Sequence, residues 1–401
     1  MAELTETTPE AIHSDLASIA TTLGGTLTAV IEAIPGGPHR PTPLARKLGI
    51  SRVTASKMLN ALARPNPYEM LQDIPGPESL RAVTAAAPDL GADASLVREA
   101  EDAIDRFAQA IRHQFGTRAA LNAAISTRSA NLQARVEQSS RYEVFKGMRQ
   151  IMGVEAETWL TSMIFAPSPA DPMAMSITTI HGAMRLRRLR PDVPIYFTFG
   201  PPKQHNANNT ELPSSPFKLN EFCTNTPATM ETEVAAGQLV HRLAHDKLGK
   251  EAVVDMLAAS HNPRGAPRYA SPERTKGGVS AFVDIPVKNM ICDALVHADL
   301  FPGSTPQLLV YNPGARGPAN PNDPRRDIDL VAVPEEIECL GNAEDRFDLA
   351  EAPRYPDMVK KMCAQIGRDE SEFRLFRLRM AYPVTAFQFV MAFRAPPAPQ
   401  D

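Results

Sequence analysis

The sequence is poor in the features that mark several protein classes. Only four cysteines occur in 401 residues, and no two of them form a CxxC pair. This spacing argues against a disulfide scaffold and against a structural zinc site. No run of about 18 uniformly apolar residues is present, which argues against a membrane span. The net charge of −4 gives no overall attraction to nucleic acid, so any basic surface must be local.

Length and composition indicate a globular protein of more than one domain. A chain of 401 residues is long for one ordinary hydrophobic core. Its hydrophobic content of 43% and charged content of 22% are typical of soluble proteins. Proline is abundant, with 37 residues, which predicts many loops and sharply ended helices and strands. The first residues, MAELTETTPEAIHSDL, are acidic and polar, unlike a signal peptide. We therefore expect a cytoplasmic protein.

The segment LARKLGISRVTASKMLNAL, residues 44–62, predicts two short helices joined by a tight turn. Thr42 and Pro43 suit the start of the first helix, where Thr42 can act as a cap. Gly49 supplies the permissive backbone at its end. Ser51 can cap the second helix, whose apolar positions recur at helical spacing. Helix, glycine turn and capped helix together indicate a helix-turn-helix.

The outward face of the second helix carries side chains suited to DNA. Arginine, lysine, asparagine and serine can bind base edges or phosphates in a major groove. From Ala33 to Tyr68 the chain has no acidic residue but six basic ones, a local charge of +6. The residues expected to contact double-stranded DNA are Thr42, Ser51, Arg52, Val53, Ser56, Lys57 and Asn60.

The pattern L-A-x-x-L-G-I-S-x-x-T-x-S-K resembles the helix-turn-helix of bacterial transcriptional regulators. The following segment, YEMLQDIPGPESLRAVTAAA, is similar to the two-stranded wing of MarR-like and IclR-like winged helices. A helix from roughly Ser14 to Ile34 would complete their trihelical core. The resemblance covers residues 10–90 and implies that Arg81 is a wing contact. The expected wing tip carries Glu78 and no basic residue, which argues against its insertion into the minor groove.

Residues 91–141 are expected to form a helical connector. Between Ser95 and Phe115 the apolar residues fall three or four positions apart, as on a helix with one narrow apolar seam. The seam could pack on the chain's own domains. We favour a homodimer, because a DNA operator with two-fold symmetry is bound by two DNA-binding domains. The residues of the seam are Val97, Ala100, Ile104, Phe107, Ile111 and Phe115.

Residues 142–395 alternate between two kinds of segment. WLTSMIF, PIYFTF, SAFVDIPV and QLLVYNP predict buried strands, whereas IHGAMRLRRL, METEVAAGQLVHRLAHDKL, KEAVVDMLAAS and YPDMVKKMCAQI predict helices. We expect a mixed α/β domain, and an α+β protein as a whole. Long polar loops at 200–218, 261–278 and 311–327 could border a ligand site.

The C-terminal region shows no clear catalytic pattern. His241 and His245 have the spacing of metal ligands on a helix, but the glutamate of HExxH is missing. The basic cluster from Arg185 to Arg190 is expected to be a solvated helix face. The segments 314–317 and 325–327 could bind an anion, although solvated loops are favoured. Buried structural roles are expected for Trp159 and for Cys223, Cys292 and Cys363. No phosphate loop or nucleophile elbow occurs, so no cofactor, metal or catalysis is expected.

The sequence therefore predicts a DNA-binding transcriptional regulator whose C-terminal domain senses a small-molecule effector or mediates dimerisation. The first alternative is an enzyme, such as a methyltransferase, with an accessory winged helix for dimerisation. A glycine-rich nucleotide loop after the first C-terminal strand would favour that enzyme, but WLTSMIFAPSPADP contains none. The second alternative is a protein-interaction module without a ligand.

Overall fold

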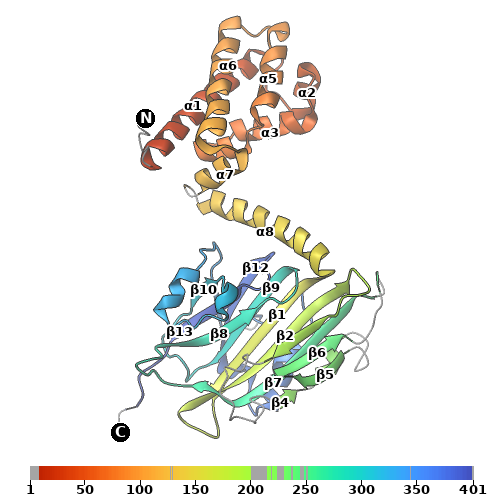
Figure 1. Ribbon diagram of the computed structural model, residues 1–401, viewed down its shortest axis with the longest axis vertical. Helices are drawn as coiled ribbons and strands as arrows, with labels where there is room; N and C mark the ends of the chain where they lie inside the picture. Colours follow the sequence, from red (N-terminus) through yellow and green to blue (C-terminus); the bar gives the residue numbers. More distant parts are fainter. Residues whose placement is uncertain are drawn as a thin grey trace. The chain divides into compact units, whose positions relative to one another are not determined.

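The chain forms two units, residues 1–137 (unit 1) and residues 138–401 (unit 2), each with its own core. The computed structural model describes residues 9–126, 128, 130–199, 215–217, 219–223, 230–235, 238–243, 248–249, 252–343 and 345–399. Unit 1 is helical, and unit 2 consists mainly of strands (Figure 1). Helices account for 40% of the structure and strands for 28%, which confirms the α+β class.

Unit 1 begins with three helices that match the expected positions of the trihelical core. These are α1 (Pro9–Ala33), α2 (Pro41–Leu48) and α3 (Arg52–Leu62). The later helices are α4 (Pro67–Asp73), α5 (Pro77–Ala86), α6 (Ala94–Gln109), the π-helical turn η2 (Ala110–Phe115), α7 (Arg118–Ser126) and α8 (Ala130–Met152). Along the chain, α8 runs from unit 1 into unit 2.

The prediction of a two-stranded wing is wrong, because residues 68–87 form helices. Proline occupies the first turn of both α4 and α5, where its missing N–H costs nothing. The Asn66 side chain accepts a hydrogen bond from the backbone N–H of Tyr68 (2.9 Å) and so caps α4. In α5, Leu80 and Val83 are buried at helical spacing. The Pro-Gly-Pro segment is therefore a junction between two helices.

Helix α1 is the most apolar helix of unit 1. Residues Asp15–Ala33 have a mean hydropathy of 1.3, high enough for a membrane-crossing helix by length and composition alone. Several of its large side chains, including Leu16, Leu23, Leu27 and Val30, are fully buried in the helical core. Because 33% of this window is buried, packing within unit 1 accounts for part of the apolar character of α1.

The apolar seam of α6 faces the interior of the same chain. Val97, Ile104 and Phe107 are buried in one core with residues of α1 and α5, and α6 packs against both helices. The seam is therefore already covered and cannot serve as the expected dimer interface.

Unit 2 contains three sheets among its described residues. The largest has the strand order β11-β12-β9-β1-β2-β7-β4, in which β1 and β9 are parallel and the other neighbours antiparallel. The bounds are β1 (Val154–Pro167), β2 (Ala174–Arg188), β4 (Ser215–Phe217), β7 (Val254–Pro267), β9 (Val287–His297), β11 (Glu338–Gly341) and β12 (Phe373–Ala381).

Two smaller antiparallel sheets and helix α9 also belong to unit 2. The order β10-β13-β8 joins β10 (Gln307–Tyr311), β13 (Gln388–Arg394) and β8 (Lys276–Phe282). The order β3-β6-β5 joins β3 (Tyr196–Phe199), β6 (Gln238–Leu243) and β5 (Met230–Ala235). Helix α9 spans Tyr355–Gln365.

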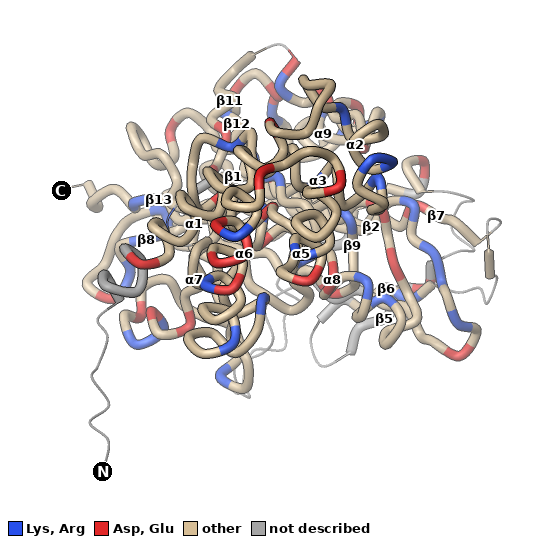
Figure 2. The backbone as a smooth tube through the Cα atoms, turned by 90° about the horizontal axis from the view of Figure 1, so that it is seen from above, with Lys and Arg blue, Asp and Glu red and all other residues tan. Residues whose placement is uncertain are grey.

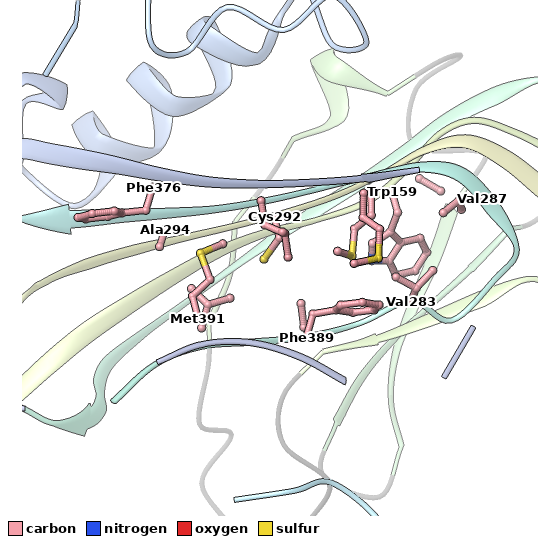
Figure 3. Close-up of a cluster of buried hydrophobic side chains, with 14 of the residues drawn as sticks. Trp159, Val283, Val287, Cys292, Ala294, Phe376, Phe389 and Met391 are labelled. Atoms are coloured by element: carbon pink, nitrogen blue, oxygen red, sulfur yellow. The ribbon is translucent and has the colours of Figure 1, made fainter. Parts of the chain in front are cut away.

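The seven-stranded sheet is buried on both faces. On one face Trp159 and Cys292 meet Phe389 and Met391 of the β10-β13-β8 sheet (Figure 3). On the other face the residues next along the strands, such as Leu160 and Ile291, pack with Met358, Val359 and Met362 of α9. Adjacent residues of a strand therefore pack into different cores, because successive side chains point to opposite faces of the sheet. The expected burial of Trp159 is confirmed, and its exposed fraction is zero.

The strands predicted for unit 2 are confirmed, since WLTSMIF, PIYFTF and QLLVYNP lie mainly in β1, β3 and β10 and SAFVDIPV lies partly in β8. Three of the four predicted helices are wrong. YPDMVKKMCAQI does form α9, but IHGAMRLRRL belongs to β2, KEAVVDMLAAS lies mostly in β7, and the described parts of METEVAAGQLVHRLAHDKL are β5 and β6. Alanine, leucine and methionine favour helices in isolation. Here burial on both faces of a sheet decides the conformation, because β-structure depends on packing more than on intrinsic preference.

A charged cluster lies inside unit 2 between the large sheet and α9. The Arg377 guanidinium donates to both carboxylate oxygens of Asp293, at 2.9 and 2.7 Å, and both side chains are almost fully buried. The Tyr355 hydroxyl donates to the same carboxylate at 2.7 Å and lies 2.6 Å from the Ser162 hydroxyl. Burial, together with the charge of Asp293, raises the pKa of Tyr355 well above its ordinary value. Each member of the cluster therefore has a polar partner.

Two buried histidines make unit 2 sensitive to acid. Burial lowers the pKa of His181 to about 3 and that of His241 to about 4, and each also lies among packed side chains. His181 is 3.0 Å from the Thr161 hydroxyl, and its ring contacts Trp159 edge-on. In the unfolded chain a histidine takes up a proton below about pH 6.5. The two neutral histidines therefore contribute to the stability of the folded state above about pH 6.5. This contribution is lost as the pH falls toward their folded-state pKa values of about 3 and about 4.

At pH 5 each histidine should reduce the free energy of unfolding by about 2 kcal/mol relative to pH 8, because only the unfolded state is protonated. Urea unfolding followed by Trp159 fluorescence measures this difference. The double variant His181→Gln, His241→Gln should lose the part of the pH dependence that is due to these two histidines, while keeping the parts due to the carboxylates and to the other histidines, such as His261. An unchanged pH dependence in that variant would contradict the prediction.

Candidate nucleic-acid interface

Residues 41–62 form two helices, α2 and α3, joined by a tight turn, as the sequence predicted. Helix α2 ends at Gly49, whose φ of 65° is in the left-handed region that glycine adopts without strain. The backbone N–H of Ile50 donates to the Ala45 carbonyl (3.0 Å) and closes the turn. The Ser51 side chain then accepts from the Thr54 backbone N–H (3.0 Å), as expected for the cap of α3. The conformational preference of Gly49 and the cap formed by Ser51 therefore explain where α2 ends and where α3 begins.

Helix α3 has one buried side and one exposed side. Ala55, Met58 and Ala61 pack toward the core. On the other side Ser51, Arg52, Val53, Lys57 and Asn60 are exposed, and Ser56 is half-buried. Val53 is 64% exposed, and among the described side chains of unit 1 it is the one large hydrophobic residue that is so exposed. An exposed valine on a basic helix face can contact the methyl group of thymine.

The exposed basic residues gather on α2 and α3. Arg40, Arg46, Arg52 and Lys57 are exposed, and none of them has an ion pair among the described residues. Lys47 is also exposed, and its ammonium group donates to the Pro35 carbonyl. Figure 2 marks the charged positions along the backbone. Because no acidic residue occurs between residues 33 and 68, most of this charge is available to an anionic partner.

Arg64 is the exception in the basic window. Its guanidinium is 3.1 Å from the Asp73 carboxylate and 4.0 Å from that of Glu69. Both acids belong to α4, just beyond the window. Arg64 is therefore neutralised locally, and the free charge is smaller than the +6 counted from the sequence.

Two expected contacts need correction. Thr42 does not cap α2, because the helix already begins at Pro41 and its cap position is Arg40, which makes no side-chain cap bond. Thr42 is nevertheless exposed in the first turn. Arg81 is not a wing contact, because it lies on α5 and binds the carboxylates of Glu78 and Asp105, both at 2.7 Å.

The candidate motifs of unit 2 mostly have structural explanations. His241 is buried in β6 and not on a helix, whereas His245 lies outside the described residues. The cluster from Arg185 to Arg190 begins within β2 and not on a helix face, and there Arg187 binds the buried carboxylate of Glu155.

The remaining motifs lie in a loop and in the cores. Arg316 and Arg326 of the loop segments both bind Asp329. Cys292 and Cys363 are buried as expected, Cys223 is half-buried, and none of the four cysteines forms a disulfide. Burial raises the pKa of Cys363 to about 12, which makes it a poor nucleophile.

The described residues offer no alternative metal centre, since nowhere among them do three or more His, Cys, Asp or Glu side chains gather as ligands. No known protein family model matches the chain. A search of curated proteins also finds no significant match. The geometry of the helix-turn-helix is therefore the main guide to function.

The structure adds Arg40 and Arg46 to the expected interface. Both lie at or near α2 and are exposed. The sequence already placed them in the acid-free window, but of the residues on or beside the first helix only Thr42 was expected to contact DNA. In DNA-bound motifs of this kind the first helix crosses the phosphate backbone, so the position of Arg40 before α2 and of Arg46 in its last turn could have been used to predict them.

Proposed function

We propose that unit 1 binds duplex DNA with α3 in the major groove, and that the protein is a transcriptional regulator. The observation that carries the proposal is the exposed, acid-free face formed by the capped start of α3 and its neighbours on α2. A helix with this exposure and charge has the features of a recognition helix. The proposal rests on the helix-turn-helix alone, without a wing.

The side chains of α3 suit different roles. Arg52 can form two hydrogen bonds with guanine, and Val53 can pack against a thymine methyl group. Lys57, one turn further along, suits a phosphate, which fixes position without reading sequence. Because Arg40 and Arg46 lie on or beside α2, they would add further phosphate contacts.

Substitutions at Arg52 and Lys57 should have different effects on DNA binding. Lys57→Ala should weaken binding to all sequences. If one phosphate contact is lost, a plot of the logarithm of the binding constant against the logarithm of the salt concentration should become less steep by about 0.9. Arg52→Ala should cost about 1–3 kcal/mol on the preferred site and relax the base preference. Fluorescence polarisation titrations of genomic fragments at several salt concentrations measure both effects.

Arg98→Ala is the matched control, because Arg98 is exposed on α6, outside the basic window. It should leave DNA affinity unchanged. Equal losses in all three variants would indicate only a general charge effect. If no genomic fragment binds better than bulk DNA, the sequence-specific proposal is wrong.

We further propose, as the sequence suggests, that unit 2 regulates the DNA-binding unit by sensing a ligand or by dimerisation. Of the loops expected to border a ligand site, residues 200–214 lie outside the described part of the chain. The segment 261–278 is largely strand, since β7 extends to Pro267 and β8 begins at Lys276. The segment 311–327 is the loop whose arginines bind Asp329.

A further inference from the structure

A groove of about 390 Å³ lies within unit 1, between α1 and the segment that joins α3 to α4. Thr21, Gly25, Thr28 and Glu32 form its α1 side, and Leu62 and Pro65 lie on the opposite side. Small-molecule sites typically have volumes of about 300–1,000 Å³ and combine apolar walls with a few polar groups. The groove falls in this range of volume, is open to solvent, and has both apolar and polar side chains in its lining.

Gly25 keeps the groove open at a cost to the helix. A glycine inside a helix is less favourable than alanine by about 1 kcal/mol. A Cβ atom at Gly25 would meet nothing within 4 Å, so packing inside the chain does not require the glycine. Its neighbour Gly24 differs, because a Cβ there would contact the Met70 side chain at 3.4 Å. The space beside Gly25 therefore serves no packing need of unit 1.

The groove also carries an uncompensated negative charge. Glu32 is exposed in the last turn of α1 and has no ion pair among the described residues. The end of a helix favours cations, yet this turn contains no basic residue. Arg64, the basic residue that lines the groove, is already bound by Asp73 and Glu69. The nearby groups of His39 and Lys47 bind the carbonyls of Ile34 and Pro35.

We propose that this groove binds a small organic cation with an apolar body, and that the bound cation changes DNA affinity. The ammonium group would pair with Glu32, and the apolar body would lie over Gly25 against Leu62 and Pro65. This charge arrangement excludes a carboxylate as the preferred ligand, because Glu32 would repel it.

The second half of the proposal rests on the proposed DNA-binding function. Helix α3 packs on α2 and α4, and α1 packs on α4 and α6, so α4 is the main link between α1 and α3. A ligand in the groove would touch α1 and the end of α3 directly. The ligand changes DNA affinity to the extent that it binds one arrangement of α3 more tightly than another. Bound DNA then changes the affinity for the ligand by the same factor.

The test titrates the full chain with benzylamine, phenethylamine and cyclohexylamine by calorimetry, with benzyl alcohol and benzoate as uncharged and anionic controls. At least one amine should bind saturably, and benzoate should not. Glu32→Gln should weaken that binding about two- to fivefold, the effect expected for loss of one ion pair at an exposed carboxylate. Gly25→Leu should abolish it by filling the groove, while circular dichroism shows an intact fold. Glu101→Gln, at an exposed site on α6, should leave it unchanged.

Absence of saturable binding by all three amines overturns the proposal, as does equal binding to Glu32→Gln or equal binding of benzoate. The coupling is measured by DNA titration with and without the bound amine, in the wild type and in Gly25→Leu. Amine binding that leaves DNA affinity unchanged overturns the regulatory half. DNA binding without amine binding overturns the groove proposal alone, whereas amine binding without any DNA binding overturns the proposed function.

Discussion

Replacing Asp293 with Asn should lower the free energy of unfolding of unit 2 by about 3–5 kcal/mol, the usual cost of breaking a buried ion pair. The substitution removes the charge but keeps the size of the side chain. It leaves the buried Arg377 guanidinium without its carboxylate, in a place that water does not reach. Urea unfolding followed by Trp159 fluorescence reports this loss, because Trp159 lies in the core of the same unit.

The double variant Asp293→Leu, Arg377→Met is the control for the Asp293 prediction. It removes both charges and fills the space with apolar atoms, so most of the lost stability should return. The Tyr355 hydroxyl would keep Ser162 as its partner. A single variant Asp293→Asn within about 1 kcal/mol of the wild type would contradict the prediction, because a cost that small is typical of exposed ion pairs.

Replacing Phe107 with Glu should unfold unit 1. The ring is fully buried, and the Arg118 guanidinium lies 5.0 Å from its centre. Truncating such a ring costs about 3–5 kcal/mol, and burying a carboxylate in its place costs more. Far-ultraviolet circular dichroism should show loss of helix, and DNA binding should disappear. Trp159 fluorescence should remain native, because unit 2 has its own core.

Arg106→Glu provides the matched control, because the adjacent position on α6 is exposed. It introduces the same side chain without burying it, so unit 1 should stay folded. The opposite result would be a folded Phe107→Glu variant whose mass falls by half in light scattering. That result would show that the apolar seam of α6 forms a dimer interface, and it would contradict the burial of Phe107 in the core of unit 1.

The helix-turn-helix could be predicted from the sequence because its signals are local. Gly49 adopts a conformation that few other residues tolerate, and Ser51 caps the helix that follows it. The wing was predicted wrongly because Pro-Gly-Pro suits both a hairpin turn and the start of a helix. Proline at the first helical position followed by Glu78 would have favoured the helix.

The contacts of individual side chains were harder to predict, because their partners are distant in sequence. One partner of Arg81, Glu78, lies in its own segment, but the other, Asp105, comes from α6. Likewise, residues 180–189 have the composition of a helix and yet form a strand, because the sheet is covered on both faces. No pattern within a short segment indicates that β1 pairs with β9, since several other strands lie between them in the chain.

The parallel pairing of β1 with β9 has a consequence for the order of folding. The helices of unit 1 pack on one another within the first 137 residues, with α1 against α4 and α6, so these contacts can form before unit 2 has been synthesised. The centre of unit 2 cannot close until β9 has been synthesised, and β9 then needs β12 to cover its other edge. A growing chain on the ribosome should therefore carry a finished helical unit ahead of an open sheet with unpaired strand edges. During that interval the nascent protein would be most prone to aggregation and most dependent on chaperones.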